Sequence, residues 1–141
     1  MSKSPRPSSP RGRGDGFRMP AEWAPHRGTW LSWPHRESSW PDKFVPVPAV
    51  FAEIVRHLAP REEVHINVAD ADMEAAARAT LRQSGVATGN VFFHWHPTND
   101  AWCRDHGPMF VEKNNNGRRE QRILDWGFNA WGGKYPPFDA D

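Results

Sequence analysis

The sequence is poor in several features that would mark a secreted or membrane protein. Its 141 residues include a single cysteine, Cys103, and a single tyrosine, Tyr135. One cysteine excludes an internal disulfide and favours a reducing compartment. No apolar run approaches the roughly 20 residues that a bilayer-spanning helix needs, and no stretch has the apolar middle region of a secretory signal. These shortages predict a cytoplasmic protein without a membrane partner.

Net charge is also scarce, and its distribution is uneven. The 18 Lys and Arg residues nearly balance the 17 Asp and Glu residues, which leaves a formal charge of +1. The first 18 residues hold five of the basic side chains against Asp15 alone, so the remaining body carries 13 basic and 16 acidic side chains, a net −3. A body with this charge lacks the basic face that nucleic acid requires. It mildly favours a cationic small molecule as ligand.

The first 18 residues differ in composition from the rest of the chain. They are rich in Ser, Pro, Arg and Gly, and no apolar residue stands between Met1 and Phe17. Such a segment buries too little apolar surface to offset the entropy of ordering it, so residues 1–18 are expected to form a disordered basic tail. A transit peptide or a nucleic-acid-binding arm is the alternative interpretation of its basic, acid-poor composition.

Hydrophobic spacing predicts strands that alternate with helices. Six apolar residues between Val47 and Leu58 fall on one helical stripe, and Val64, Ile66 and Val68 alternate as in a strand with one buried face. The full prediction is strand 29–33, helix 47–58, strand 63–68, helix 70–82, strand 90–95, and a hairpin with strands 109–111 and 121–126. The strand at 90–95 is apolar on both faces, which predicts a place in the middle of a sheet. This order is typical of an α/β fold.

Residues 98–108 gather most of the candidate functional groups. Asp105 is the strongest, because a carboxylate offers two acceptor oxygens that match a planar guanidinium. Trp102 could stack against a cation. Arg104 lies between them, either as a substrate-binding residue or as an internal partner that neutralises Asp105 or Asp100. Under that last interpretation the loop is only stiffened by an ion pair.

Two further groups suggest other chemistry. Cys103 stands close to His106 and could act as a thiol nucleophile, although a small buried thiol in a packed loop is favoured, because catalytic partners are usually far apart in sequence. His94 and His96 lie on one side of an extended strand, a spacing at which two imidazoles can share a metal ion. Asp100, Asp105 or His106 would complete such a set, and a small metal-binding module is the alternative function from another class.

Four segments together resemble the agmatine deiminase and bacterial (Porphyromonas-type) peptidylarginine deiminase family of guanidine-modifying enzymes. The two longest carry the patterns N-D-x-W-x-R-D-x-G-P and D-W-x-F-N-x-W-G-G, which are rich in rare residues and therefore specific. In chain order the segments are Met19–Trp23 with Pro25 and His26, Thr29–Pro34, Asn99–Pro108 and Asp125–Gly133. They span almost everything after the tail.

The resemblance implies a five-fold pseudo-symmetric α/β propeller-like barrel, known as the pentein fold. It implies hydrolysis of a guanidinium to a ureido group with release of ammonia, without metal or organic cofactor. A cysteine thiolate attacks the guanidinium carbon, a histidine moves protons, and two carboxylates hold the guanidinium nitrogens. Asp105 matches the first carboxylate and Trp102 a substrate-contacting tryptophan. Asn99, Asp100, Gly107 and Trp131 are expected to shape the two loops that carry the motifs.

The resemblance also predicts that residues 19–141 are the truncated N-terminal portion of a longer catalytic domain. The family's nucleophile and its His-x-Asp pair have no counterpart here, and Cys103 occupies a variable position of the motif. The 141 residues alone are therefore expected to be inactive. The expected substrate is agmatine, converted to N-carbamoylputrescine on a polyamine route, with arginine or peptidylarginine as the rival. The full-length enzyme is expected to be capable of homo-oligomerisation.

Overall fold

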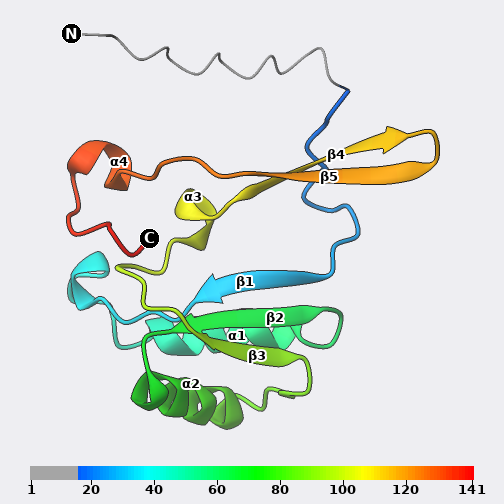
Figure 1. Cartoon of the computed structure of the whole chain (residues 1–141). Helices are drawn as coiled ribbons and strands as arrows, with labels where there is room; N and C mark the ends of the chain where they lie inside the picture. The colour runs from blue at the N-terminus through cyan, green and yellow to red at the C-terminus, as the bar shows by residue number, and fades with distance from the viewer. Residues whose placement is uncertain (1–15) are drawn as a thin grey trace, which may run out of the picture. The chain divides into compact units, whose positions relative to one another are not determined.

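The computed structural model describes residues 16–141, which form two compact parts. One part combines the chain before Pro25 with residues 108–125, and the other combines residues 25–107 with 126–141. The expected tail covers residues 1–18, and its first 15 residues lie outside the described part of the chain. Figure 1 shows the helices and strands of each part.

The smaller part is a β-hairpin joined by the segment that precedes it. Strands β4 (Met109–Asn115) and β5 (Arg118–Leu124) pair antiparallel. Asn116 and Gly117 both adopt positive φ at the turn, as an Asn-Gly hairpin turn requires. Arg18 forms a β-bridge with Glu112, and the Arg122 guanidinium lies 3.9 Å from the centroid of the Phe17 ring. The hairpin prediction is confirmed, with longer strands than expected.

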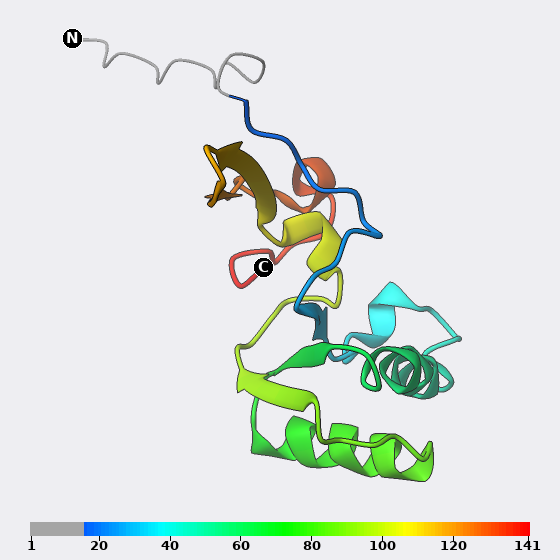
Figure 2. The same ribbon diagram turned by 90° about the vertical axis from the view of Figure 1, so that its right-hand side faces the viewer.

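The larger part contains a parallel sheet of three strands with order β1-β2-β3. A helix connects each pair of consecutive strands, and both helices lie on one face of the sheet (Figures 1 and 2), as right-handed crossovers require. The hydrophobic periodicity of the sequence predicted the strands and helices of this part with bounds close to those observed. They are β1 (Gly28–Ser32), α1 (Val47–Leu58), β2 (Glu63–Val68), α2 (Ala71–Gln83) and β3 (Val91–Trp95).

The core lies between the sheet and the two helices. Alternate β2 residues Val64, Ile66 and Val68 are at most 1% exposed and pack with Val55 of α1 and Leu81 of α2. Each fully buried aliphatic side chain of this kind contributes roughly 1.5–3 kcal/mol through the hydrophobic effect. The larger part thus has a core of its own.

Local signals fix the ends of α2. Asp70 accepts a hydrogen bond from the Met73 amide at 2.9 Å, as predicted for an N-cap. Gly85 follows the helix with φ of 68°, a left-handed conformation that closes a helix at little cost for glycine. Both features follow from the residue types alone.

One expectation about this part is wrong. Strand β3 lies at the edge of the sheet and β2 in the middle, because β2 pairs with both neighbours. Phe92 of β3 is accordingly 43% exposed. The predicted helix 47–58 is confirmed as α1, and of its apolar stripe Val55 is fully buried whereas Val50 and Ile54 are exposed.

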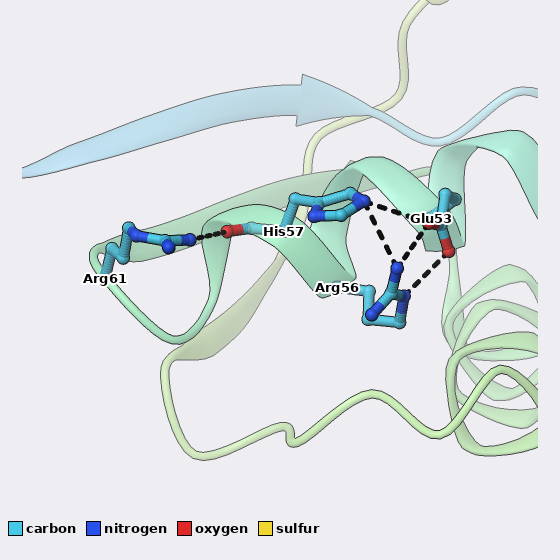
Figure 3. A network of polar contacts seen from close by, with 4 residues as sticks. All are labelled: Glu53, Arg56, His57 and Arg61. Atoms are coloured by element: carbon cyan, nitrogen blue, oxygen red, sulfur yellow. Dashed lines mark hydrogen bonds and ion pairs between the residues drawn. The ribbon is translucent and has the colours of Figure 1, made fainter.

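The outer side of α1 carries a charged network (Figure 3). Arg56 donates hydrogen bonds to both carboxylate oxygens of Glu53, and the His57 ring nitrogen Nε2 lies 2.9 Å from the same carboxylate. Arg61 donates to the backbone carbonyl of His57 at 3.2 Å. The Arg56 hydrogen bond is the main reason that the pKa of Glu53 is lowered to about 2. These residues are solvent-exposed and mark the surface of the helix.

Among residues 16–141, none of the helices is long and apolar enough to cross a membrane.

Candidate active site

A cavity of about 910 Å³ lies in the larger part, and three segments far apart in the sequence form its walls. The first wall is residues 36–41, the second is residues 100–105 and the third is residues 131–136. The lining residues are Arg36, Ser38, Ser39, Pro41, Asp100, Trp102, Asp105, Trp131, Lys134, Tyr135 and Pro136. Such a concave site with aromatic walls and a few charged groups is typical of a small-molecule pocket.

The second wall is the expected functional loop, and a single helical turn organises it. Helix α3 (Cys103–His106) stands where the sequence predicted an irregular loop. The Gly107 amide donates to the Cys103 carbonyl oxygen at 2.8 Å and ends the turn. A Cβ atom at Gly107 would lie 2.5 Å from that oxygen, so only glycine fits without a shift of the backbone. The turn presents Asp105 at the pocket.

Asp105 and Asp100 have opposite environments. The Asp100 side chain is buried, accepts a hydrogen bond from the Ser39 hydroxyl, and accepts another from the Ala101 amide at 2.8 Å. The Asp105 carboxylate is exposed and makes no hydrogen bond or ion pair with residues 16–141. Asp100 is therefore committed to the protein, whereas Asp105 is available to a cationic ligand.

Aromatic rings line the pocket beside Asp105. Trp102 is 39% exposed and packs against Trp40 of the first wall, with ring centroids 5.4 Å apart. In the third wall Trp131 packs edge-on against Tyr135 at 5.7 Å. Trp131 has φ of 56°, a left-handed conformation that is unfavourable for a bulky residue and is often found at functional sites.

The third wall begins in the second motif-bearing segment, Asp125–Gly133, which contains a distorted helical turn, α4 (Ala130–Gly133). The Asn129 side chain accepts a hydrogen bond from the Gly132 amide at 2.9 Å and caps this turn. Phe128 of the same loop packs against His106 of α3, with ring centroids 5.9 Å apart. The two motif-bearing loops are therefore neighbours in this part of the molecule.

The environment of Cys103 does not favour a role as a nucleophile. Its Sγ lies 3.1 Å from the Ser32 hydroxyl oxygen, which also accepts a hydrogen bond from the Asn67 side-chain amide at 3.3 Å. Burial raises the pKa of the Cys103 thiol, which disfavours the reactive thiolate. The structure favours the interpretation of Cys103 as a packed thiol.

His94, on β3, and His96, directly after its last residue, were the basis of the alternative metal-binding interpretation. His94 Nε2 lies 2.9 Å from Nδ1 of His65, and the rings of His94 and His96 lie parallel with centroids 6.1 Å apart. Burial, followed by the proximity of His65 and His96, lowers the pKa of His94. Within residues 16–141 no group of three or more His, Cys, Asp and Glu side chains is placed to hold a metal ion. His94 belongs to an aromatic stack with His65 and Trp30.

The structure places some of the predicted site residues in the pocket and others outside its lining. Asp100, Trp102, Asp105 and Trp131 line it, whereas Arg104, Asn99 and Gly107 do not. Sequence reasoning missed the whole first wall and the Lys134, Tyr135 and Pro136 side of the third. Residues 36–41 show no periodicity, so only their mixture of Arg, Ser and Trp gave any signal.

Comparison with known proteins matches the family model described as Porphyromonas-type peptidyl-arginine deiminase over residues 18–141. An agmatine deiminase of Stutzerimonas stutzeri is 43% identical over 129 residues, which cover 92% of this chain and 33% of that protein. One of Ectopseudomonas mendocina is 45% identical over 121 residues, 86% of this chain and 30% of the relative. The chain thus spans about a third of the length of these curated relatives.

Solved structures agree with the sequence matches. The agmatine deiminase of Enterococcus faecalis has a TM-score of 0.72 and 32% identity, covering 89% of this chain and 33% of that one. The agmatine deiminase of C. jejuni, solved with substrate bound, has a TM-score of 0.67 and 26% identity, covering 88% of this chain and 33% of that one.

Proposed function

Because the chain belongs to the Porphyromonas-type peptidyl-arginine deiminase family and has about a third of its pentein α/β fold, we propose that these residues form the guanidinium-holding side of a deiminase site. The observation that carries the proposal is the Asp105 carboxylate, which lies beside Trp102 in the pocket and has no hydrogen bond or ion pair with residues 16–141. A carboxylate can accept two parallel N–H bonds from a planar guanidinium. The tryptophan face can stack against the same cation.

In the proposed reaction, agmatine and water give N-carbamoylputrescine and ammonia. Asp105 fixes two guanidinium nitrogens, which presents the central carbon to a nucleophile at a constant distance and angle. A thiolate adds to that carbon, ammonia leaves, and water resolves the covalent intermediate. Cys103 packs against Ser32, is partly buried and has a raised pKa, so we do not propose it as the nucleophile. Agmatine is proposed because the matched relatives are agmatine deiminases.

The test uses the intact natural polypeptide that contains these residues. Asp105→Asn keeps the size of the side chain and removes its charge. Hydrogen bonds to charged groups contribute roughly 1.5–3 kcal/mol, so kcat/KM for agmatine should fall roughly 10- to 100-fold or more. The matched control is Asp72→Asn, since Asp72 lies in the first turn of α2 and does not line the pocket. Ammonia release that survives unchanged in Asp105→Asn would reject the role of Asp105.

A second substrate class is favoured by one feature of the pocket. Lys134 lines the third wall and makes no ion pair with the described residues, and Arg36 lies in the first wall. A cation in this position would attract the carboxylate of arginine or a neighbouring acidic group of a peptide, and would repel the ammonium of agmatine. The relative kcat/KM for arginine and agmatine therefore discriminates the two. Lys134→Gln should shift this ratio toward agmatine if arginine is the natural substrate.

A further inference from the structure

The three walls of the pocket come from distant parts of the chain, and a polar link joins each pair of the segments that carry them. Ser39 of the first wall donates to Asp100 of the second. The Arg36 guanidinium of the first wall donates to the Pro136 carbonyl oxygen of the third at 3.1 Å. The remaining link joins the second wall to the chain just after the third, at Asp141.

The Asp141 link is a carboxylate that receives two successive backbone amides. Its Oδ1 accepts a hydrogen bond from the Asn99 amide at 2.8 Å and from the Asp100 amide at 3.2 Å. The Asn99 side-chain amide also donates to Asp139 Oδ1 at 3.2 Å. Two consecutive N–H groups aimed at one anion form a concave site for negative charge, which here is filled by the protein's own side chain.

These contacts fix Asp100, which precedes the helical turn that carries Asp105. The Asp100 amide is held by Asp141, and the Asp100 carboxylate is held by Ser39 and the Ala101 amide. With its donor and its side-chain acceptors engaged, this buried residue has little rotational freedom left. Helix α3 starts three residues later, so the orientation of Asp100 is transmitted to Asp105 through a short, hydrogen-bonded backbone.

The carboxylates at and near the pocket differ in whether they accept hydrogen bonds from the protein. Asp100, Asp139 and Asp141 each accept hydrogen bonds from the protein, whereas Asp105 makes none with residues 16–141. Of these four, only Asp100 and Asp105 line the pocket, so a cationic guanidinium that enters it meets Asp105 as the lining carboxylate without a hydrogen bond to residues 16–141. The other three have a structural use.

We infer that Asp141 is a positioning residue that holds the Asn99–Asp100 backbone and thereby aims Asp105 and Trp102 at the guanidinium. The inference rests on the proposed function for the identity of the ligand, but the clamp itself can be measured without any substrate. Its prediction is that loss of the Asp141 carboxylate loosens the loop first, and weakens catalysis as a result.

The experiment compares Asp141→Asn, which keeps one acceptor oxygen, with Asp141→Leu, which keeps none, in the intact natural polypeptide. Amide hydrogen exchange in a peptide covering residues 98–102 should accelerate about tenfold in Asp141→Leu, as expected for loss of a hydrogen bond to a charged acceptor, and less in Asp141→Asn. Asp72→Leu on α2 is the matched control, with unchanged exchange in residues 98–102. The Asn variant is close in shape, so it reports on the clamp even if the Leu variant fails to fold.

Steady-state kinetics on the same variants separates positioning from a merely structural role. We expect kcat/KM for agmatine to fall about tenfold in Asp141→Leu, with partial rescue in Asp141→Asn and no change in the control. Unchanged exchange in residues 98–102 would overturn the clamp. Faster exchange with unchanged kcat/KM would show that Asp141 holds the loop but does not position the site. If the wild type deiminates no guanidine at all, the proposed function fails, and the exchange data still decide whether the clamp exists.

Discussion

The core of the larger part and its pocket are built by different physical means. The core is held by apolar side chains that alternate along β2 and recur along two helices, so Ile66 and Leu81 are fully buried without directional contacts. The pocket is held by a few hydrogen bonds between segments about 40 to 100 residues apart, such as Arg36 with Pro136 and Ser39 with Asp100. Apolar burial stabilises through many non-directional contacts whose contributions add up, whereas each hydrogen bond requires one arrangement of its donor and acceptor. Substitutions should therefore reduce stability in the core and disturb geometry in the pocket.

The largest effect on stability is expected in the core. Ile66→Ala removes buried methyl and methylene groups from the central strand and leaves a cavity, which should lower the free energy of unfolding by about 2–5 kcal/mol. Urea unfolding of the intact polypeptide measures this loss. Ile66→Val is the matched control, with an expected loss of about 0.5–1.5 kcal/mol. Equal losses in the two variants would mean that the cavity at β2 collapses.

A smaller loss is expected at the pocket. Ser39→Ala removes the hydroxyl that donates to the buried Asp100 carboxylate and leaves that acceptor with one fewer partner. The expected cost is about 1–3 kcal/mol in unfolding free energy, with a rise in KM for the guanidinium substrate because the second wall moves. Ser38→Ala is the control, because Ser38 also lines the pocket but receives its hydrogen bond from Arg36. A wild-type KM in Ser39→Ala would show that the link does not shape the site.

The Asp70 cap of α2 should affect the stability of the protein but not the pocket. Asp70→Ala removes the acceptor for the Met73 amide and should lower stability by about 1 kcal/mol, without any effect on substrate affinity. Thermal unfolding together with KM tests both halves of this expectation. Asp70→Ser retains a capping oxygen and should restore most of the loss. A change in KM would indicate that α2 is coupled to the pocket.

The smallest effect is expected on the exposed side of α1, where the prediction concerns pH. The pKa of Glu53 is lowered from 4.5 to about 2, chiefly by its hydrogen bond with Arg56. A depressed folded-state pKa stabilises the protein above the unfolded value, near pH 4.5, and this contribution is lost as the pH falls toward 2. The pair is solvent-exposed, so Glu53→Gln should leave the melting temperature at pH 7 almost unchanged.

The titration of Glu53 can be followed directly by NMR of its side-chain carboxyl carbon. In wild type the midpoint should lie near pH 2, and in Arg56→Gln it should move back toward 4.5. Arg61→Gln is the control, since Arg61 donates to a backbone carbonyl and not to Glu53. A midpoint that is the same in wild type and Arg56→Gln would reject the hydrogen bond as the cause.

The regular elements could be predicted from the sequence because their signals are local. The Val64, Ile66 and Val68 alternation placed β2 at its observed bounds, and Asp70 marked the start of α2. The position of β3 could not be predicted in the same way. Its apolar faces suggested a central strand, but strand order depends on which strands pair, and β3 pairs with β2 alone among the described strands.

The sequence predicted pocket residues only where they belong to a distinctive motif. Trp102 and Asp105 stood out in a loop dense with functional groups, and both line the pocket. The roles given to all the predicted site residues, Asp105 and Trp102 included, stay predictions. The first wall gave no periodic signal, because residues 36–41 acquire their place at the pocket through contacts with residues far along the chain.

The sequence by itself determined the elements of the larger part, the hairpin and the identity of the loop that carries Asp105. These follow from periodicity, capping and turn chemistry, which act over a few residues. Only the tertiary structure decided that β2 is the central strand. It also decided that Asp100 forms hydrogen bonds with Ser39 and Asp141, whereas the Asp105 carboxylate forms none with residues 16–141. The physical reason is that hydrogen bonds between distant segments depend on where the fold places them, and no local pattern encodes that distance.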